Sequence, residues 1–194
     1  MKFKVIIILA VLSVFIAGCA TSRKIPVAST IERMGVVYQI HADQPFTGIV
    51  TASYRSGRPK TSVEYCDGMK DGLQVEWLKN GRKSEIITWR NGVRDGEQMQ
   101  WYENKQKSFQ GRMRQGKWAG ECRGWYPDGR PAFQVFFQDG QGSGDTIVIK
   151  WNKDNLVREF TDVKLDGEWI EWHASGRLVR REKYHDGKLI EKLR

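Results

Sequence analysis

The sequence is poor in features that several protein classes require. Only five of its 194 residues are proline, too few for the composition of a disordered tract, although twenty are glycine. Its longest apolar run, Val5–Ala17, is almost unbroken and has thirteen residues, whereas a helix needs roughly 20 to cross the bilayer hydrocarbon. These shortages favour an ordered chain and argue against a helical membrane span.

Residues that carry catalysis or bind metals are also few and scattered. The three histidines, His41, His173 and His185, have no Cys, Asp or Glu near them at metal-ligand spacing, so we expect them to face solvent. Acidic residues fall mostly in turns, where Asp-Gly pairs serve the backbone, or among polar strand residues. Since catalysis needs positioned acids, bases or nucleophiles in a concave site, we expect no enzyme, no metal and no cofactor.

The first nineteen residues have the layout of a secretory signal. A basic start with Lys2 and Lys4 is followed by the apolar run and by the small residues before Cys19. The ending Ile16-Ala17-Gly18-Cys19 resembles a bacterial lipobox, which implies that residues 1–18 are a lipoprotein signal peptide and that Cys19 is the lipid-attachment residue. A plain signal peptide, or an uncleaved anchor with a coincidental cysteine, is the alternative.

The lipobox resemblance also implies a location. Ala20 follows the cysteine, and in lipoproteins of double-membrane bacteria a residue other than Asp there implies export to the outer membrane. We therefore expect a lipid-anchored protein of the cell envelope. Removal of residues 1–18 discards two Lys and no acidic residue, so the mature charge is 30 − 23 = +7. Outside the cytoplasm, this charge favours acidic headgroups or an acidic protein over nucleic acid as the counterpart.

A period of about 24 residues runs through the rest of the chain. Glycines at positions 48, 72, 96, 120, 144 and 167 are separated by 24, 24, 24, 24 and 23 residues, a spacing typical of repeat architectures. Further glycines follow the leading one by nine and by twenty residues. A tryptophan follows it by five residues in four units, at Trp77, Trp101, Trp125 and Trp172, and Trp89 stands seventeen residues after Gly72.

Each unit has the pattern of a β-hairpin. Leu73, Val75 and Trp77 alternate with polar residues, which is the signal of a strand. Reversals are expected at Asn-Gly and Asp-Gly pairs, which accept the positive φ of tight turns. These pairs are Asn80-Gly81, Asn91-Gly92, Asp128-Gly129, Asp139-Gly140 and Asp186-Gly187.

Successive hairpins with short connections predict an all-β fold. We expect an elongated single-layer antiparallel β-meander, built from about six 24-residue hairpin repeats over residues 46–194. Lys105 replaces the turn glycine of the third unit, and the fifth unit has its turn rebuilt around Asn152–Asn155, so we expect the array to bend or twist there.

The segments outside the repeats and the cysteines give further expectations. Within residues 19–45 we expect a flexible tether over residues 20–30, then either an edge strand at residues 36–40 or an ordered cap on the first hairpin. Residues 188–194 should finish the far edge. Cys66 and Cys122 would lie five strands apart, roughly 24 Å, whereas a disulfide needs Cα atoms within about 7 Å. We therefore predict no bridge between them and two free thiols.

The repeat motifs resemble a known family. Phe46-Thr47-Gly48, Asp71-Gly72-x4-Trp77-x3-Gly81-Arg82 and Asp95-Gly96-x4-Trp101-Tyr102 are similar to the MORN-repeat variant of bacterial proteins of the YwqK antitoxin type, over about residues 46–190. The resemblance implies a binding scaffold, since such repeats serve many functions.

One face of the predicted sheet should collect large apolar side chains. The expected members are Val75, Trp77, Ile87, Trp89, Met99, Trp101, Phe109, Met113, Trp125, Phe133, Val135, Phe137, Ile147, Ile149, Ile170, Trp172 and Tyr184. A single layer could cover them by curling, by self-association or with a partner protein. We take Trp77, Trp89, Trp101, Trp125 and Trp172 as partner-binding candidates.

Two functions remain open at this point. The first is a membrane-anchored protein-binding module, specifically an immunity or antitoxin-like protein that binds a secreted toxin. The second is a structural envelope lipoprotein that self-associates or contacts acidic lipid headgroups through its basic residues.

Overall fold

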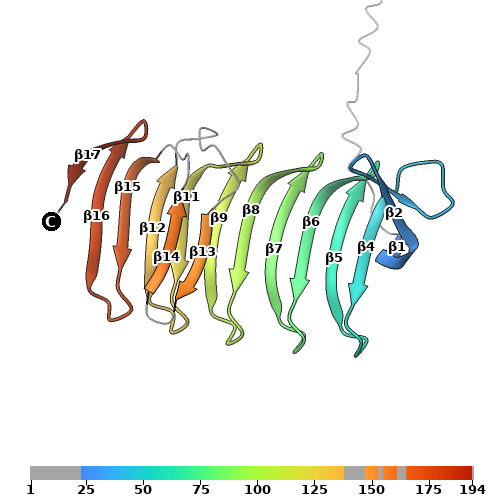
Figure 1. The fold of residues 1–194 in the computed structure, drawn as a ribbon, viewed down its shortest axis with the longest axis horizontal. Coiled ribbons are helices and arrows are strands. Elements are labelled where there is room, and N and C mark those ends of the chain that lie inside the picture. The colour runs from blue at the N-terminus through green and yellow to red at the C-terminus, as the bar shows by residue number, and fades with distance from the viewer. Residues whose placement is uncertain (1–22, 138–146, 153–154, 161–164, 194) are drawn as a thin grey trace, which may run out of the picture.

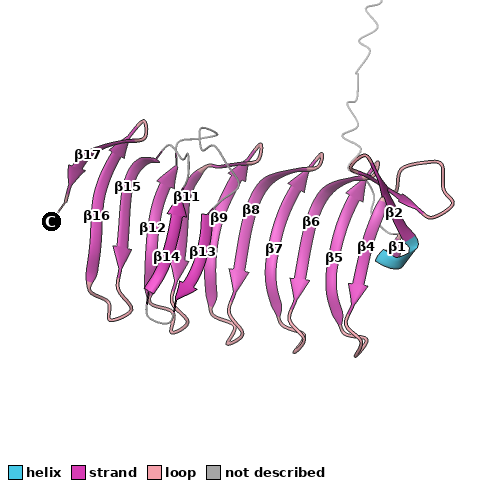
Figure 2. Cartoon of the chain, in the orientation of Figure 1, coloured by secondary structure: helices cyan, strands magenta, loops and turns pink. Residues whose placement is uncertain are grey.

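The computed structural model describes residues 23–137, 147–152, 155–160 and 165–193, and it is almost entirely β (Figure 2). Its main element is a 13-stranded sheet whose strands lie side by side in a long row (Figure 1). The predicted all-β meander is confirmed. No helix within those residues is long and apolar enough to cross a membrane. The predicted signal peptide and Cys19 lie outside them.

Five hairpins form the body of the sheet, and each strand pairs with its neighbour antiparallel. The strands of the first three hairpins are β4 (Gly48–Ser53), β5 (Pro59–Cys66), β6 (Met69–Trp77), β7 (Lys83–Arg90), β8 (Val93–Trp101) and β9 (Lys107–Arg114). Those of the last two are β11 (Gly120–Trp125), β12 (Pro131–Phe137), β15 (Leu165–Trp172) and β16 (Leu178–His185), with β17 (Lys188–Lys192) as the far edge. The short strand β10 (Lys117–Trp118) pairs with β9.

The prediction of six hairpins in one sheet is wrong at the fifth unit. Strands β13 (Ile147–Asn152) and β14 (Asn155–Phe160) form a separate two-stranded sheet, and β12 pairs directly with β15. After position 144 the fifth unit has neither Trp five residues on nor Gly nine and twenty residues on, whereas the unit beginning at Gly167 has all three. The sixth unit therefore keeps the repeat residues that the fifth has lost, and its first strand is the one that pairs with β12. In Figure 1, β13 and β14 are drawn in front of β11 and β12.

Two kinds of turn alternate along the row. Between units, the pairs Asn91-Gly92 and Asp186-Gly187 both have positive φ, with 48° and 77° in the first. Within units, Gly81 has φ 82° and donates its N–H to the carbonyl of Leu78 at 2.8 Å. Both kinds confirm the predicted reversals within the described residues, and Asp139-Gly140 lies outside them.

The leading glycines have a different role from the turn glycines. Gly96 lies inside β8 with φ 126°, beside a register shift between Ile87 and Trp89 of β7. A Cβ on Gly96 would lie 2.7 Å from the Cβ of Thr88, closer than real Cβ atoms approach. The glycines nine and twenty residues after the leading one serve the reversals, whereas Gly96 serves a bulge inside a strand.

The N-terminal segment is more ordered than predicted. Residues 24–26, expected in a flexible tether, form β1 (Lys24–Pro26), which pairs with β4 in parallel and gives the near edge. The predicted edge strand instead forms the small hairpin of β2 (Thr30–Arg33) and β3 (Val36–Gln39), after the 3-10 turn η1 (Val27–Ser29). Val37 packs with Phe46 in a buried cluster, so this segment is the cap that was the alternative expectation.

The cross-strand register divides the side chains between two faces. Val75 is opposite Ile86, which is opposite Met99, while Ile87 is opposite Gln98. Side chains alternate along a strand, so Val75 and Ile87 point to opposite sides. The face that we call the core face carries Ile87, Trp89, Phe109, Met113, Phe133, Val135, Phe137 and Tyr184. The face that we call the tryptophan face carries Val75, Trp77, Met99, Trp101, Trp125, Ile170 and Trp172.

The prediction that both sets share one face is therefore wrong. It would require Val75 to pair with Ile87, but Val75 pairs with Ile86. A shift of one residue moves a whole strand's set of side chains to the other face, which explains the size of the error.

The main hydrophobic core lies on the core face over β9 to β15. Its buried members are Phe109, Met113, Trp118, Cys122, Tyr126, Ala132, Phe133, Val135, Phe137 and Leu165. Phe109 meets Trp118 edge to face, with ring centroids 5.3 Å apart. Two glycines leave room for these rings: a Cβ on Gly124 would lie 2.0 Å from Phe133, and one on Gly111 would lie 2.6 Å from the Cys122 sulfur. Burial is thus concentrated in one part of the row.

The two described cysteines differ. Cys122 is free and fully buried, and the predicted absence of a Cys66–Cys122 bridge is confirmed. The prediction that Cys66 is a free thiol is wrong, because Cys66 is disulfide-bonded. The distance argument addressed only its pairing with Cys122.

Cys122 should be inert in the folded protein. Burial raises the pKa of its thiol to about 12, and the thiolate is the reactive form. We expect no alkylation of Cys122 by iodoacetamide at pH 8 over hours, and rapid alkylation in guanidinium chloride, with peptide mass spectrometry as the readout. Rapid native alkylation would show that this part of the core opens freely.

Candidate protein-binding surface

The five candidate tryptophans are half-buried, and they do not share a surface. Trp77, Trp101, Trp125 and Trp172 lie on the tryptophan face, each at the end of the first strand of its hairpin. Trp89 lies on the core face, opposite Gly72 of β6 and Arg94 of β8. The sheet therefore brings four of the candidates into one row and excludes the fifth.

A ladder of tyrosine hydroxyls fixes the backbone at three of these tryptophans. Tyr54 donates to the carbonyl of Trp77 at 2.6 Å, and Tyr102 donates to the carbonyl of Trp125 at 2.8 Å. Tyr126 donates to the carbonyl of Trp172 at 2.8 Å, because the sixth unit, not the fifth, is its neighbour in the sheet. Burial raises the pKa of Tyr102 far above its ordinary value, so its hydroxyl keeps its proton and its donor role. Three units thus hold the next in-sheet unit in register, whereas Leu78 stands at the tyrosine position before Trp101.

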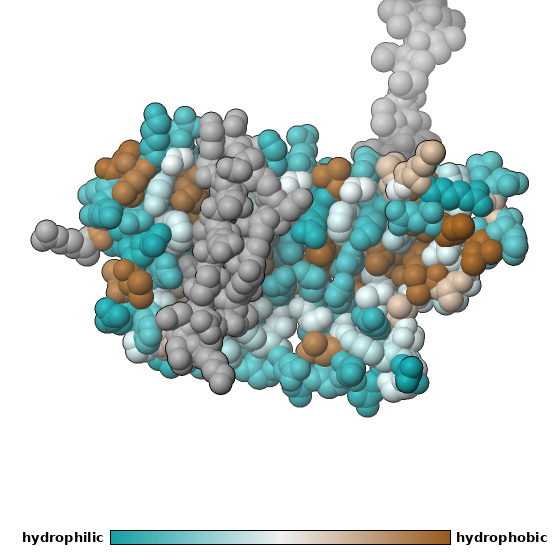
Figure 3. All heavy atoms as spheres, viewed as in Figure 1, coloured by the Kyte–Doolittle hydropathy of each residue, from teal (hydrophilic) through white to brown (hydrophobic). Residues whose placement is uncertain are grey.

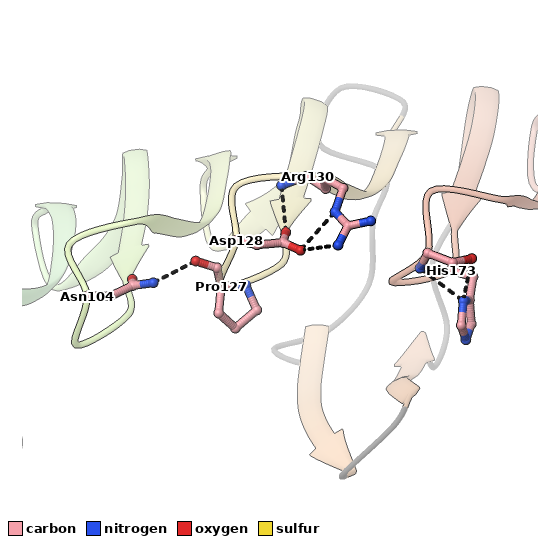
Figure 4. Close-up of polar contacts among 6 residues, drawn as sticks. Asn104, Pro127, Asp128, Arg130 and His173 are labelled. Carbon is pink, nitrogen blue, oxygen red and sulfur yellow. Dashed lines mark hydrogen bonds and ion pairs between the residues drawn. The ribbon is translucent and has the colours of Figure 1, made fainter.

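The turns at this end of the strands are also linked. Arg58 donates to the carbonyl of Lys79 at 3.1 Å, and Arg82 donates to the carbonyl of Glu103 at 2.5 Å. Asn104 donates to the carbonyl of Pro127 at 2.6 Å (Figure 4). These contacts join each of the first three turns to the turn of the next unit.

In the following turn, Arg130 is used differently. Its guanidinium contacts the Asp128 carboxylate at 2.6 Å, within the same turn (Figure 4). Hydrogen bonds from Arg130 hold the pKa of Asp128 below its usual value. The charge of this arginine is therefore already paired, unlike that of an arginine that contacts only a carbonyl.

The ring of Trp89 already contacts two cationic side chains of the protein. The Lys70 ammonium lies 4.4 Å from the centre of its ring, and the Arg94 guanidinium lies 5.5 Å from it. Burial, and then the nearby Arg94, lowers the pKa of Lys70. Because these cations cover the ring, Trp89 is a poor candidate for contact with a partner.

Trp101 has a different environment, a hollow of about 350 Å³ lined by Arg82, Lys83, Trp101 and Lys105. The three cationic residues come from two neighbouring units, Arg82 and Lys105 from turns and Lys83 from the start of β7. The sequence-based selection included Trp101 but missed the three cations. Their signal was present in the sequence, in the pair Arg82-Lys83 and in Lys105 at a glycine position.

The large apolar side chains expected on one face do not form a broad exposed surface in the described residues. No aromatic residue in the described part of the chain is among the exposed large apolar residues, which are spread from Val27 to Ile190. On the side seen in Figure 3, brown patches are separated by hydrophilic and intermediate surface. A second hollow of about 140 Å³ is polar and of mixed charge, since it is lined by Glu97, Arg112, Glu121 and Arg123 together with Gln110 and Gly111.

Two of the histidines have polar side-chain partners. His185 lies 3.0 Å from Asp166, and His173 accepts a hydrogen bond from the backbone of Ser175 within its turn. Over the residues that the structure describes, no three His, Cys, Asp or Glu side chains gather as metal ligands.

No protein-family model and no curated protein sequence matches this chain. The resemblance of its motifs to MORN-repeat variants therefore remains an expectation from the sequence.

Proposed function

We propose that the protein is a lipid-anchored binding module of the cell envelope, and that a protein partner docks on its tryptophan face around Trp101. The observation that carries the proposal is the hollow in which a half-buried tryptophan lies among Arg82, Lys83 and Lys105. Tryptophan and arginine are the residues that most often dominate the energy of protein interfaces.

The repeated scaffold supports binding rather than catalysis. The tyrosine hydroxyls hold the backbone at Trp77, Trp125 and Trp172, and Arg82 holds the turn that follows Trp101, so the scaffold is ordered before a partner arrives, which lowers the entropy lost on binding. Twelve strands in sequence, at about 4.8 Å each, give a surface roughly 55 Å long, sufficient for an interface of standard size. A secreted toxin, bound by this module as an immunity protein, is the partner that we propose.

The test compares matched tryptophans on the two faces. The mature chain carrying Cys19→Ser is used as bait for the product of the adjoining gene, and affinities are measured by calorimetry. Trp101→Ser is expected to weaken binding about 30-fold, the loss of a hot-spot residue, because its ring fills the docking site. Trp89→Ser, on the core face, should leave affinity within about threefold. Circular dichroism checks that both variants are folded. Equal affinities for the two variants would contradict docking on the tryptophan face.

Lipid anchoring makes a separate prediction. Wild-type protein is expected in the membrane fraction, with an N-terminal peptide heavier by the mass of its acyl chains. The Cys19→Ser variant should carry no acyl chains, because the thioether forms on the cysteine sulfur. Fractionation with intact-mass measurement checks both points. A wild-type protein that carries no lipid would favour the plain signal peptide or the uncleaved anchor.

A second function has one specific observation in its favour. Strand β17 ends the sheet, all of its residues are exposed, and Leu189 and Ile190 are apolar. An open edge can pair with another chain, although Lys188 and Lys192 oppose this. A structural lipoprotein would show concentration-dependent association by sedimentation velocity, or retention on acidic liposomes that disappears at moderate salt.

A further inference from the structure

The turn beside Trp101 departs from the repeat. The equivalent position is glycine in the other in-sheet hairpins, at Gly57, Gly81, Gly129 and Gly176, all with φ between 79° and 87°. In the third hairpin it is Lys105, which has φ 75° and still donates its N–H to the carbonyl of Tyr102 at 3.0 Å. A residue with a side chain is unfavourable in this left-handed conformation. The turn is therefore unchanged, and the lysine is held there at a cost to stability.

The same hollow collects charge that the other units lack. Its other two cations are Arg82 and Lys83, a pair that the other in-sheet hairpins do not repeat. The equivalent pairs are Arg58-Pro59, Gln106-Lys107, Arg130-Pro131 and Arg177-Leu178. Each of those pairs contributes one cation, whereas Arg82-Lys83 contributes two and Lys105 adds a third beside Trp101.

The three cations are also available to a ligand. Within the part of the chain that the structure describes, no carboxylate forms an ion pair with Arg82, Lys83 or Lys105. Arg82 donates to a backbone carbonyl, which orients its guanidinium and leaves its charge unneutralised. Strain and unpaired like charge at one place are typical of a functional site.

We infer that this hollow binds an acidic segment of the protein partner. Asp or Glu carboxylates would lie against Arg82, Lys83 and Lys105, and an apolar or aromatic side chain between them would pack on Trp101. The inference rests on the proposed function and specifies the chemistry of the partner. The charge of the mature chain, +7, also attracts acidic partners during encounter.

The test uses defined peptides on the mature chain carrying Cys19→Ser. The probe is an acetylated, amidated peptide with one Phe between two runs of three Glu, and its Gln counterpart is the neutral control. Binding is followed by the NMR shifts of the Trp101 indole and the Lys105 amide. We expect the Glu peptide to bind with salt-dependent affinity and the Gln peptide to show no saturable shift.

Two variants and one matched control isolate the charges. Lys105→Gly is expected to weaken peptide binding about fivefold, the effect of one partly exposed ion pair, while its melting temperature rises by about 2–4 °C as the turn strain is relieved. The double variant Arg82→Gln with Lys83→Gln should weaken binding about 25-fold. Arg55→Gln removes one charge from a turn of the first hairpin and should leave affinity unchanged.

Specific outcomes would overturn the inference. Wild-type affinity of Lys105→Gly for the Glu peptide would do so, as would an equal loss in Arg55→Gln. If phosphatidylglycerol vesicles bind and the Glu peptide does not, and if Lys105→Gly abolishes vesicle binding, the site serves a lipid surface and the inference is wrong. If the protein partner is lost with Trp101→Ser but retained by both charge variants, the inference fails while the proposed function stands.

Discussion

Replacing Phe133 with alanine is expected to destabilise the folded protein by about 3–5 kcal/mol, the usual loss for a fully buried phenylalanine. The ring is 2% exposed and lies against the bare backbone of Gly124, where even a Cβ would come within 2.0 Å. It also packs against Phe109, with ring centroids 6.3 Å apart. The cavity would open where the sheet has its densest core, so little of it can collapse.

The chain provides a matched control three residues away. Phe136 lies on the other face of the same strand and is half-buried, so Phe136→Ala should cost about 1 kcal/mol. Urea unfolding followed by circular dichroism measures both. If the two variants lose the same stability, the core is not concentrated on the face that carries Phe133.

Gly96→Ala is expected to destabilise the protein by about 2–4 kcal/mol, because two costs coincide at this strand position. Its φ of 126° is one that side-chain-bearing residues rarely adopt. The added Cβ would also lie 2.7 Å from Cβ and 2.8 Å from Cγ2 of Thr88, and a β-branched side chain in a strand has little freedom to move away.

Gly81→Ala separates the two costs. Gly81 has φ 82°, but no heavy atom lies within 4 Å of the position that an added Cβ would occupy. Only the backbone conformation is therefore unfavourable there, by about 1 kcal/mol. Thermal unfolding of the two variants gives the comparison. Equal losses would mean that the bulge at Gly96 relaxes to accept the methyl group.

The acidic residues before the leading glycines show how a local motif acts at a distance. Asp71-Gly72 and Asp95-Gly96 look like turn signals, yet both pairs lie inside strands. The Asp71 carboxylate accepts from the backbone N–H of Asn91 at 3.0 Å, and Asp95 accepts from that of Gln115 at 3.3 Å. Each carboxylate therefore supports the reversal twenty residues later. The sequence shows the dipeptide, but only the paired strands show which turn it serves.

The candidate site was predictable only in part. Trp101 could be selected because it repeats at a fixed offset. Trp89 also stands at a regular offset, which Tyr65, Met113, Phe137 and Tyr184 occupy in other units, and no local pattern could show that Lys70 and Arg94 cover its ring. Lys105 was visible as a departure from the repeat, but its place beside Arg82 and Lys83 depends on the register between neighbouring hairpins.

The sequence by itself determined the period, the hairpins and the order of most strands, because turn glycines and alternating side chains act over a few residues. Only the tertiary structure decided which side chains share a face. Val75 pairs with Ile86 and not with Ile87, and this difference of one residue places the side chains of a whole strand on the other face. It also decided that β12 pairs with β15, because the pairing of an edge strand depends on competition between distant segments, which no local pattern records.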